Sequence, residues 1–235
     1  MTVEDIKEKI SQAGFEISDL QAEKLFIYMN FLREWNEHTN LTAITEPEEI
    51  VEKHFIDSLQ LMRATDCGGD IKLIDVGSGA GFPGVPVKVF CPDIELTILD
   101  SANKRLAFLK NLCEKLDIEA ELIHMRAEEG GKMPKFREKF DIATARAVAG
   151  MNVLSEYCLP FVKNGGVFAA LKGPAAEEEL KFAEKAIDIL GGRAKNIYKT
   201  VLQNAGERNI LVIEKYKSTD KKYPRHGGTI KKSPL

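Results

Sequence analysis

Apolar residues recur at helical spacing through the first part of the chain. Ser18 and Gln21 have the spacing of a capping box, and the helix that follows carries its apolar residues on one stripe. Thr45 and Glu48 have the same spacing ahead of a second amphipathic run. Because no strand-like alternation interrupts this pattern, residues 1–66 are predicted to form an N-terminal helical cap.

The period changes after a polar, glycine-containing break at residues 66–70. Short apolar runs then alternate with amphipathic stretches, as in βα units built around a parallel sheet. The last two apolar runs have no helix between them, which indicates an antiparallel hairpin. The predicted strands are 72–76, 95–99, 120–124, 140–145, 167–172, 197–203 and 209–215, and the clearest helices are 102–116, 153–162 and 175–190. We expect an α/β fold with a mostly parallel sheet and a C-terminal antiparallel hairpin.

Charge is distributed unevenly along the chain. The net charge is only -3, yet the last 21 residues contain six lysines and one arginine against Asp220 alone. A cationic end on an acidic body suits a polyanion such as RNA, although a basic terminus can also be merely solvated. We expect three parts: the cap at 1–66, the α/β domain at 67–215 and a basic C-terminal arm at 216–235.

Composition narrows the class of protein further. The four cysteines show no CxxC pair, the N-terminus is charged, and no apolar run is long enough for a membrane span. These features favour a cytoplasmic protein over a secreted or membrane one. The four histidines are too scattered for a zinc signature, so no metal is expected, and Cys91 and Cys158 are interpreted as structural rather than nucleophilic.

A glycine-rich turn follows the first predicted strand, where open α/β sheets bind their ligands. Gly77, Gly79 and Gly81 allow positive φ angles and close approach of a ligand to the backbone. The dinucleotide fingerprint GxGxxG would need a third glycine where Phe82 stands, which weakens a pyrophosphate interpretation. A GxGxG turn after an acidic strand residue is similar to the first motif of class I S-adenosylmethionine-dependent methyltransferases.

Asp100 closes the second predicted strand and is the natural partner of this turn. A carboxylate there can accept hydrogen bonds from both hydroxyls of a ribose. The alternative is that Asp100 caps the helix that follows. The ribose interpretation supports an adenosine ligand without choosing between hydride and methyl chemistry.

Over nearly its whole length the chain resembles the RsmG (GidB) family, bacterial methyltransferases that modify N7 of a guanosine in 16S ribosomal RNA. The residues that carry the resemblance are Trp35–Asn36, Asn40–Thr42, His54–Leu59, Asp75–Gly84, Leu99–Ser101, Lys104–Arg105, Arg126–Glu128, Ala145–Ala147 and Leu171–Gly173. The resemblance implies a class I methyltransferase (Rossmann-like) sheet, S-adenosyl-L-methionine as cofactor, and 16S rRNA or the 30S subunit as partner.

The resemblance also implies roles for individual residues. It makes Gly79 a cofactor-binding residue and places Gly77 and Phe82 at the methionine part of the cofactor, Asp100 at the ribose, and Ala127 and Glu128 at the adenine. Arg146 is placed beside the methyl group as both a cofactor-binding and a catalytic residue. Arg146 could offer its guanidinium to a phosphate or to guanine O6, or it could form a structural ion pair with Asp141 or Glu128. Glu128 could equally be a surface carboxylate.

Two further residues are candidate contacts to substrate RNA. Lys172 ends the fifth predicted strand, where it could reach a phosphate, and His54 could face the site from the helical cap. Alternatively, Lys172 is a simple surface lysine, and His54 is a polar helix residue whose hydrogen bonds are satisfied within the protein.

The expected chemistry needs few catalytic groups. Guanine N7 carries a free lone pair, so it attacks a sulfonium methyl without losing a proton, and the protein mainly has to align the two. No Asn/Asp-Pro-Pro-aromatic motif follows the fourth predicted strand, which agrees with a ring nitrogen as acceptor. Two other classes stay open: a nicotinamide-dependent oxidoreductase, favoured by the glycine turn and Asp100, and a non-catalytic RNA-binding protein, favoured by the cationic arm.

Overall fold

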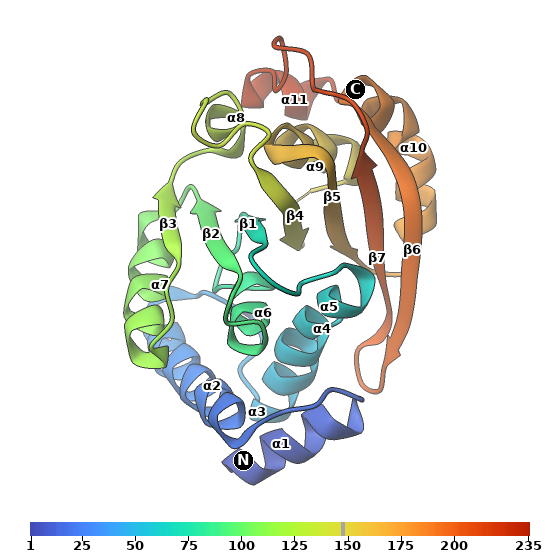
Figure 1. Cartoon of the computed structure of the whole chain (residues 1–235). Coiled ribbons are helices and arrows are strands. Elements are labelled where there is room, and N and C mark those ends of the chain that lie inside the picture. Colours follow the sequence, from blue (N-terminus) through green and yellow to red (C-terminus); the bar gives the residue numbers. More distant parts are fainter. Residues whose placement is uncertain (147–148) are drawn as a thin grey trace.

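The computed structural model describes residues 1–146 and 149–235; Ala147, one of the residues that carry the resemblance, lies outside them. Helices cover both faces of a seven-stranded sheet with the order β3-β2-β1-β4-β5-β7-β6 (Figure 1). The strands are β1 (Lys72–Val76), β2 (Glu95–Asp100), β3 (Glu121–His124), β4 (Phe140–Arg146), β5 (Val162–Lys172), β6 (Gly192–Leu202) and β7 (Gly206–Lys215). The predicted α/β fold is confirmed.

The sheet reverses its strand order at β1. β2 and β4 flank β1 in parallel, with Asp75 in register with Ile98 on one side and with Thr144 on the other. Chain connections therefore diverge on the two sides of β1, which opens a crevice at the carboxyl ends of the strands. β7 pairs antiparallel with both β5 and β6, so the predicted C-terminal hairpin is confirmed as well.

The N-terminal helices pack on one face of the sheet together with the first two crossover helices. These are α1 (Val3–Gln12), α2 (Asp19–Thr39), α3 (Pro47–Ile50), the π-helix η1 (Val51–Ile56), α4 (Asp57–Leu59), α5 (Leu61–Ala64), α6 (Gly84–Phe90) and α7 (Asn103–Leu116). The capping box of Ser18 and Gln21 is confirmed. The box predicted at Thr45 is wrong: the helix begins after Glu46, because Pro47 supplies a preset first turn.

The other face is covered by α8 (Ala127–Gly130), α9 (Met151–Cys158), the 3₁₀ turn η2 (Leu159–Phe161), α10 (Ala176–Ile189) and α11 (Gly227–Lys232). Buried apolar residues alternate between the two faces along β1 and β2, so both layers share the sheet as their core. Among the described residues, no helix is at once long and apolar enough to cross a membrane.

The C-terminal segment, residues 216–235, folds back against α8 and α9 (Figure 1). Arg225 forms a two-pronged ion pair with Glu156 of α9, with Nη2 2.7 Å from Oε2 and Nε 2.9 Å from Oε1. Arg137 donates to the Thr219 and Tyr223 carbonyls at 2.6 and 2.8 Å. The predicted basic arm is therefore packed on the domain, although the division at residues 66 and 215 remains a prediction.

Candidate active site

A pocket of about 700 Å³ opens at the carboxyl ends of β1, β2 and β4, which we call the central pocket. Gly77, Gly79 and Asp100 line one part of it, and Glu128 and Arg146 line others. The predicted cofactor residues thus converge on one cavity at the point where the strand order reverses. Its volume falls in the range typical of small-molecule sites.

The glycine loop after β1 forms the wall of the central pocket nearest the sheet. Gly79 has a φ of 63°, and no atom lies within 4 Å of the position a Cβ would occupy, so its backbone faces open space. Gly81 has a φ of 99° and is packed so tightly that a Cβ would lie 2.7 Å from the hydroxyl oxygen of Tyr28. The Tyr28 hydroxyl, from α2, donates to the Ala80 carbonyl. The helical cap therefore holds the loop from behind while its front stays open.

Asp75, in β1, anchors the far end of the same loop. The side chain is fully buried, and its Oδ2 accepts from the Gly84 amide at 2.8 Å. Its Oδ1 has no hydrogen-bond partner among the described residues. Burial raises the pKa of Asp75 to about 6, against the opposing effect of the Gly84 amide.

Asp100 lies at the floor of the central pocket and is 2 % exposed. Its Oδ2 accepts from the Gly79 amide at 3.1 Å, and its Oδ1 accepts from the Ala102 amide at 2.9 Å. Asp100 therefore holds the turn before α7, whose N-cap residue is Ala102, but it does not cap the first turn of the helix as the alternative from the sequence supposed. Arg105 Nη1 also lies 3.4 Å from Oδ2, and since a carboxylate has about four acceptor positions, Asp100 can still accept from a ligand in the pocket.

Ala127 and Glu128 begin α8 and line the pocket beyond Asp100. None of the described residues accepts from their backbone amides, as expected for the first turn of a helix. The Glu128 carboxylate likewise has no hydrogen-bond or ion-pair partner in the described part of the chain. This part of the lining thus offers two amide donors and one carboxylate acceptor, a combination that suits the edge of a heterocyclic base.

Phe82 lies under the pocket within an aromatic stack. Its ring is 5.2 Å from that of Tyr28 at an interplanar angle of 7°, and 4.3 Å from the His54 ring at 22°. The carbon of the Arg146 guanidinium lies 4.9 Å from the Phe82 centroid. Phe82 therefore supports the side chains of the helical cap against the glycine loop.

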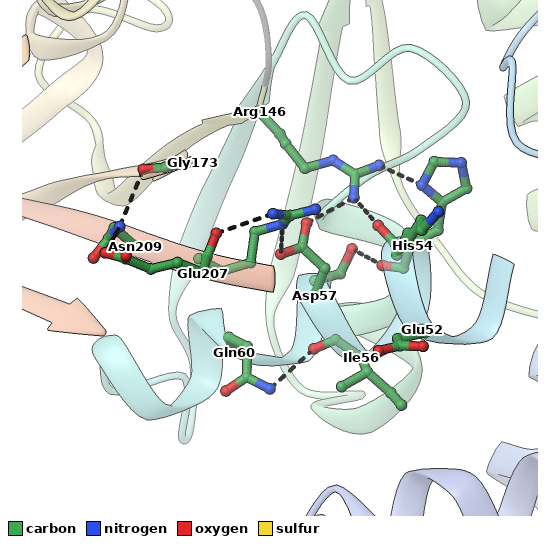
Figure 2. Close-up of polar contacts among 12 residues, drawn as sticks. Glu52, His54, Ile56, Asp57, Gln60, Arg146, Gly173, Glu207 and Asn209 are labelled. Atoms are coloured by element: carbon green, nitrogen blue, oxygen red, sulfur yellow. Dashed lines mark hydrogen bonds and ion pairs between the residues drawn. The ribbon is translucent and has the colours of Figure 1, made fainter. Parts of the chain in front are cut away.

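Arg146, the last residue of β4, meets the N-terminal helices at the mouth of the pocket (Figure 2). Its Nη1 donates to the Lys53 carbonyl at 2.9 Å and to Asp57 Oδ2 at 3.0 Å, and its Nη2 donates to His54 Nδ1 at 3.0 Å. The structural ion pair considered from the sequence exists, but its partner is Asp57 rather than Asp141 or Glu128. Three of the five guanidinium N–H groups are used, which leaves two for a substrate.

His54 is held in a defined protonation state by its neighbours. Burial and the adjacent Arg146 guanidinium lower the pKa of His54 to about 3, so its ring is neutral at physiological pH. Because Nδ1 accepts from Arg146, the ring proton is on Nε2, which lies 2.9 Å from Thr42 Oγ1. The structure therefore places the predicted RNA contact at the pocket as an acceptor for Arg146.

Asp57 is the residue of this site that the sequence analysis did not single out. It is 6 % exposed and lies between two cations, Arg146 and Arg208 of β7, the latter with Nε 3.6 Å from Oδ1. Burial raises the pKa of Asp57, and the Arg146 guanidinium opposes the rise. A signal was present, because Asp57 follows His54 by three residues and so shares its helix face.

Lys172, the other predicted RNA contact, lies outside the lining of the central pocket. Its ammonium group donates to Glu179 Oε2 and to the Ala149 carbonyl, both at 2.7 Å, and its side chain is 7 % exposed. The structure thus places Lys172 in an ion pair with Glu179, next to the backbone of Ala149. Its contact to RNA stays a prediction.

Within the described residues, no group of three or more His, Cys, Asp or Glu side chains is placed to hold a metal ion. The four cysteines, including Cys91 and Cys158, are free thiols. Burial raises the pKa of Cys158 well above its ordinary value.

Comparison with known sequences identifies close relatives over the whole chain. A family model described as GidB, rRNA small subunit methyltransferase G, matches residues 21–211. A Clostridium botulinum protein named ribosomal RNA small subunit methyltransferase G is 50% identical over 224 residues, with 94% of each chain covered. A Lactobacillus acidophilus protein of the same name is 48% identical, with 100% of each chain covered.

Solved structures support the fold. The crystal structure of P. horikoshii TYW2 in complex with MeSAdo matches with a TM-score of 0.55 and 13% identity, covering 70% of this chain and 63% of that one. At this identity the match shows a common fold alone.

Proposed function

The chain belongs to the rRNA small subunit methyltransferase G (GidB) family, and from this premise we propose that its central pocket binds S-adenosyl-L-methionine for methyl transfer to N7 of a guanosine in 16S rRNA. The observation that supports this most strongly is the cavity of about 700 Å³ at the carboxyl ends of β1 and β2, bordered by an open glycine backbone and by Asp100. It has the size and the polar groups that a nucleoside cofactor requires.

The residues of the pocket fit such a cofactor along its length. Gly77 and Gly79, with Phe82 behind them, would hold the methionine part, since only bare backbone leaves room for it there. Asp100 would accept from the ribose hydroxyls. The amides of Ala127 and Glu128 and the Glu128 carboxylate offer both donors and an acceptor to adenine. When bound, the cofactor supplies a methyl group already activated by its sulfonium.

Arg146 orients the target base at the mouth of the pocket. Its three contacts to the N-terminal helices fix the plane of the guanidinium and leave two N–H groups free. One of these can donate to guanine O6 while N7, the neighbouring acceptor, stays free to attack. Since Asp57 balances the charge of Arg146, the site adds little repulsion against the cationic methylated base.

The proposed reaction requires no general base. The attacking N7 atom has no proton to lose. The two titratable groups in contact with Arg146 already have partners: Asp57 accepts from Arg146 and lies beside Arg208, and His54 uses one ring nitrogen as an acceptor for Arg146 and the other in its contact with Thr42. Alignment of nucleophile and methyl group is therefore the main contribution of the chain's own residues.

Calorimetry with the purified chain tests the proposal against the nicotinamide alternative. We expect binding of S-adenosylhomocysteine and no binding of NADH, and incorporation of labelled methyl groups when under-methylated small subunits are supplied. Binding of NADH without any response to S-adenosylhomocysteine would contradict the proposal. Cofactor binding without methyl transfer to any RNA would instead support the non-catalytic alternative.

A further inference from the structure

The C-terminal segment reaches the central pocket from outside the sheet. Lys231 of α11 lines the pocket, and residues of α8 and α11 together line a second pocket of about 440 Å³ beside it. Glu128 lines both pockets and so stands in the wall between them. The segment therefore borders the side of the site assigned above to adenine.

Glu128 lies directly against the backbone of Gly227, the first residue of α11. A Cβ built on Gly227 would lie 2.1 Å from Glu128 Oε1 and 2.8 Å from its Cδ. The carboxylate thus occupies space that any residue other than glycine would fill. Because it has no hydrogen-bond partner among the described residues, this packing contact is what limits its position on the α11 side.

A second contact fixes α8 and the segment relative to each other. The position of a Cβ on Gly131, just after α8, is 3.1 Å from Cγ of Pro224. Pro224 precedes Arg225, whose guanidinium is bound to the fully buried Glu156. The Gly227 backbone is therefore held in place independently of Glu128.

We propose that the C-terminal segment is a working part of the cofactor site, in which Gly227 positions the Glu128 carboxylate to accept from the 6-amino group of adenine. The inference rests on the proposed function. Gly227 is a positioning residue: it touches Glu128 and not the cofactor. Displacement of Glu128 removes one charge-assisted hydrogen bond and with it the discrimination between adenine and a 6-oxo base.

The test compares Gly227→Ala with Gly228→Ala. Neither glycine has a positive φ, so alanine is acceptable to the backbone at both, but a Cβ on Gly228 meets only His226, no closer than 3.3 Å. Calorimetry with S-adenosylhomocysteine and S-inosylhomocysteine measures the base preference. We expect roughly a tenfold or greater preference for the adenosyl compound in wild type and Gly228→Ala, and its loss in Gly227→Ala.

The Glu128→Ala variant should lose the same preference, and adding Gly227→Ala to it should cause no further loss. A preference retained by Gly227→Ala would overturn the inference, as would an equal weakening of both ligands. If Gly227→Ala does not fold, a chain ending at Arg225, which keeps the ion pair with Glu156, is tested instead. It should show the same loss of preference for the adenosyl compound. Failure of the wild type to bind either ligand would instead refute the proposed function.

Discussion

At the scale of single residues, Arg146 is held at the pocket by hydrogen bonds to a distant part of the sequence. Its guanidinium contacts a carbonyl, a carboxylate and an imidazole from the same stretch of helix, 89 to 93 positions earlier in the chain. Asp100 was predicted as a site residue from its position at the end of a strand, Arg146 from the family resemblance, and His54 as a residue that could face the site. The sequence did not predict the contacts among them, because charge and hydrophobic pattern do not specify pairing across such separations.

We expect Arg146→Lys to lower kcat roughly a hundredfold while the chain stays folded, because an ammonium group cannot reproduce the planar fork. Methyl incorporation into small subunits and thermal unfolding measure the two effects. Arg33→Lys, in an exposed arginine that donates to the Thr45 carbonyl away from the pocket, is the matched control. Equal turnover in Arg146→Lys and Arg33→Lys would show that the Arg146 guanidinium is not needed for methyl transfer.

The neutral state of His54 predicts a pH dependence of stability. Because its pKa is lowered to about 3 from the ordinary 6.5, the unfolded chain takes up a proton between these values that the folded chain does not. His54 therefore contributes stability above pH 6.5 that is lost as the pH falls. Relative to His54→Asn, the wild type should lose up to about 1.4 kcal/mol per pH unit below 6.5. Parallel curves of unfolding free energy against pH would refute this.

At the scale of elements, the local sequence pattern predicted the strands of the sheet but not the π-helix η1 or the packing of the C-terminal segment. Each predicted strand overlaps an observed one, because the glycine, proline and aspartate residues that flank each apolar run mark where the strand begins and ends. The π-helix η1 interrupts the helix that presents His54 and Asp57, and no sequence pattern predicted it. Such irregular turns recur at functional sites.

The C-terminal segment could not be predicted as a packed element. Its charge pattern suits a solvated arm, and its anchor, the ion pair of Arg225 with Glu156, joins residues 69 positions apart. Glu156 was predicted only as part of a helix. Nothing in the sequence around Glu156 shows that its carboxylate is buried, because its partner, Arg225, is distant in the sequence.

We expect Arg225→Ala to destabilise the chain by roughly 3 kcal/mol, because the buried Glu156 carboxylate loses its only ion-pair partner in the described part of the chain and keeps only the backbone amide of residue 225. Lys222→Ala, on the exposed part of the same segment, should change stability by less than about 0.5 kcal/mol. Urea denaturation of both variants measures the difference. Similar midpoints would show that the segment is not anchored through this pair.

At the scale of the whole molecule, the two helical layers that cover the sheet contribute different parts of the central pocket. The N-terminal layer backs the glycine loop and contacts Arg146, while the C-terminal segment packs with the opposite layer (Figure 1) and brings Lys231 to the lining of the central pocket. The site is therefore assembled from both ends of the chain. The resemblance to a known family indicated the chemistry, but only the fold shows this division.

RNA binding should depend on the exposed lysines of α11. Deleting the whole segment would also remove the Arg225 anchor, so we expect the cleaner result from Lys231→Gln combined with Lys232→Gln. For every RNA phosphate that these lysines no longer neutralise, the slope of log affinity against log salt should flatten by about 0.7 to 0.9. The pair Lys110→Gln and Lys115→Gln on α7 is the control. Equal slopes for both pairs would exclude α11 from the RNA interface.

The most direct test of the central claim is to map the methyl group that the chain transfers. Small subunits from a strain lacking this protein are incubated with the purified chain and labelled S-adenosyl-L-methionine, and the RNA is then cleaved by chemistry specific for N7-methylguanine. We expect one labelled guanosine in 16S rRNA, methylated at N7, and a much weaker signal with Arg146→Lys. Label on another atom, or none with a chain that binds S-adenosylhomocysteine, would contradict the proposed function.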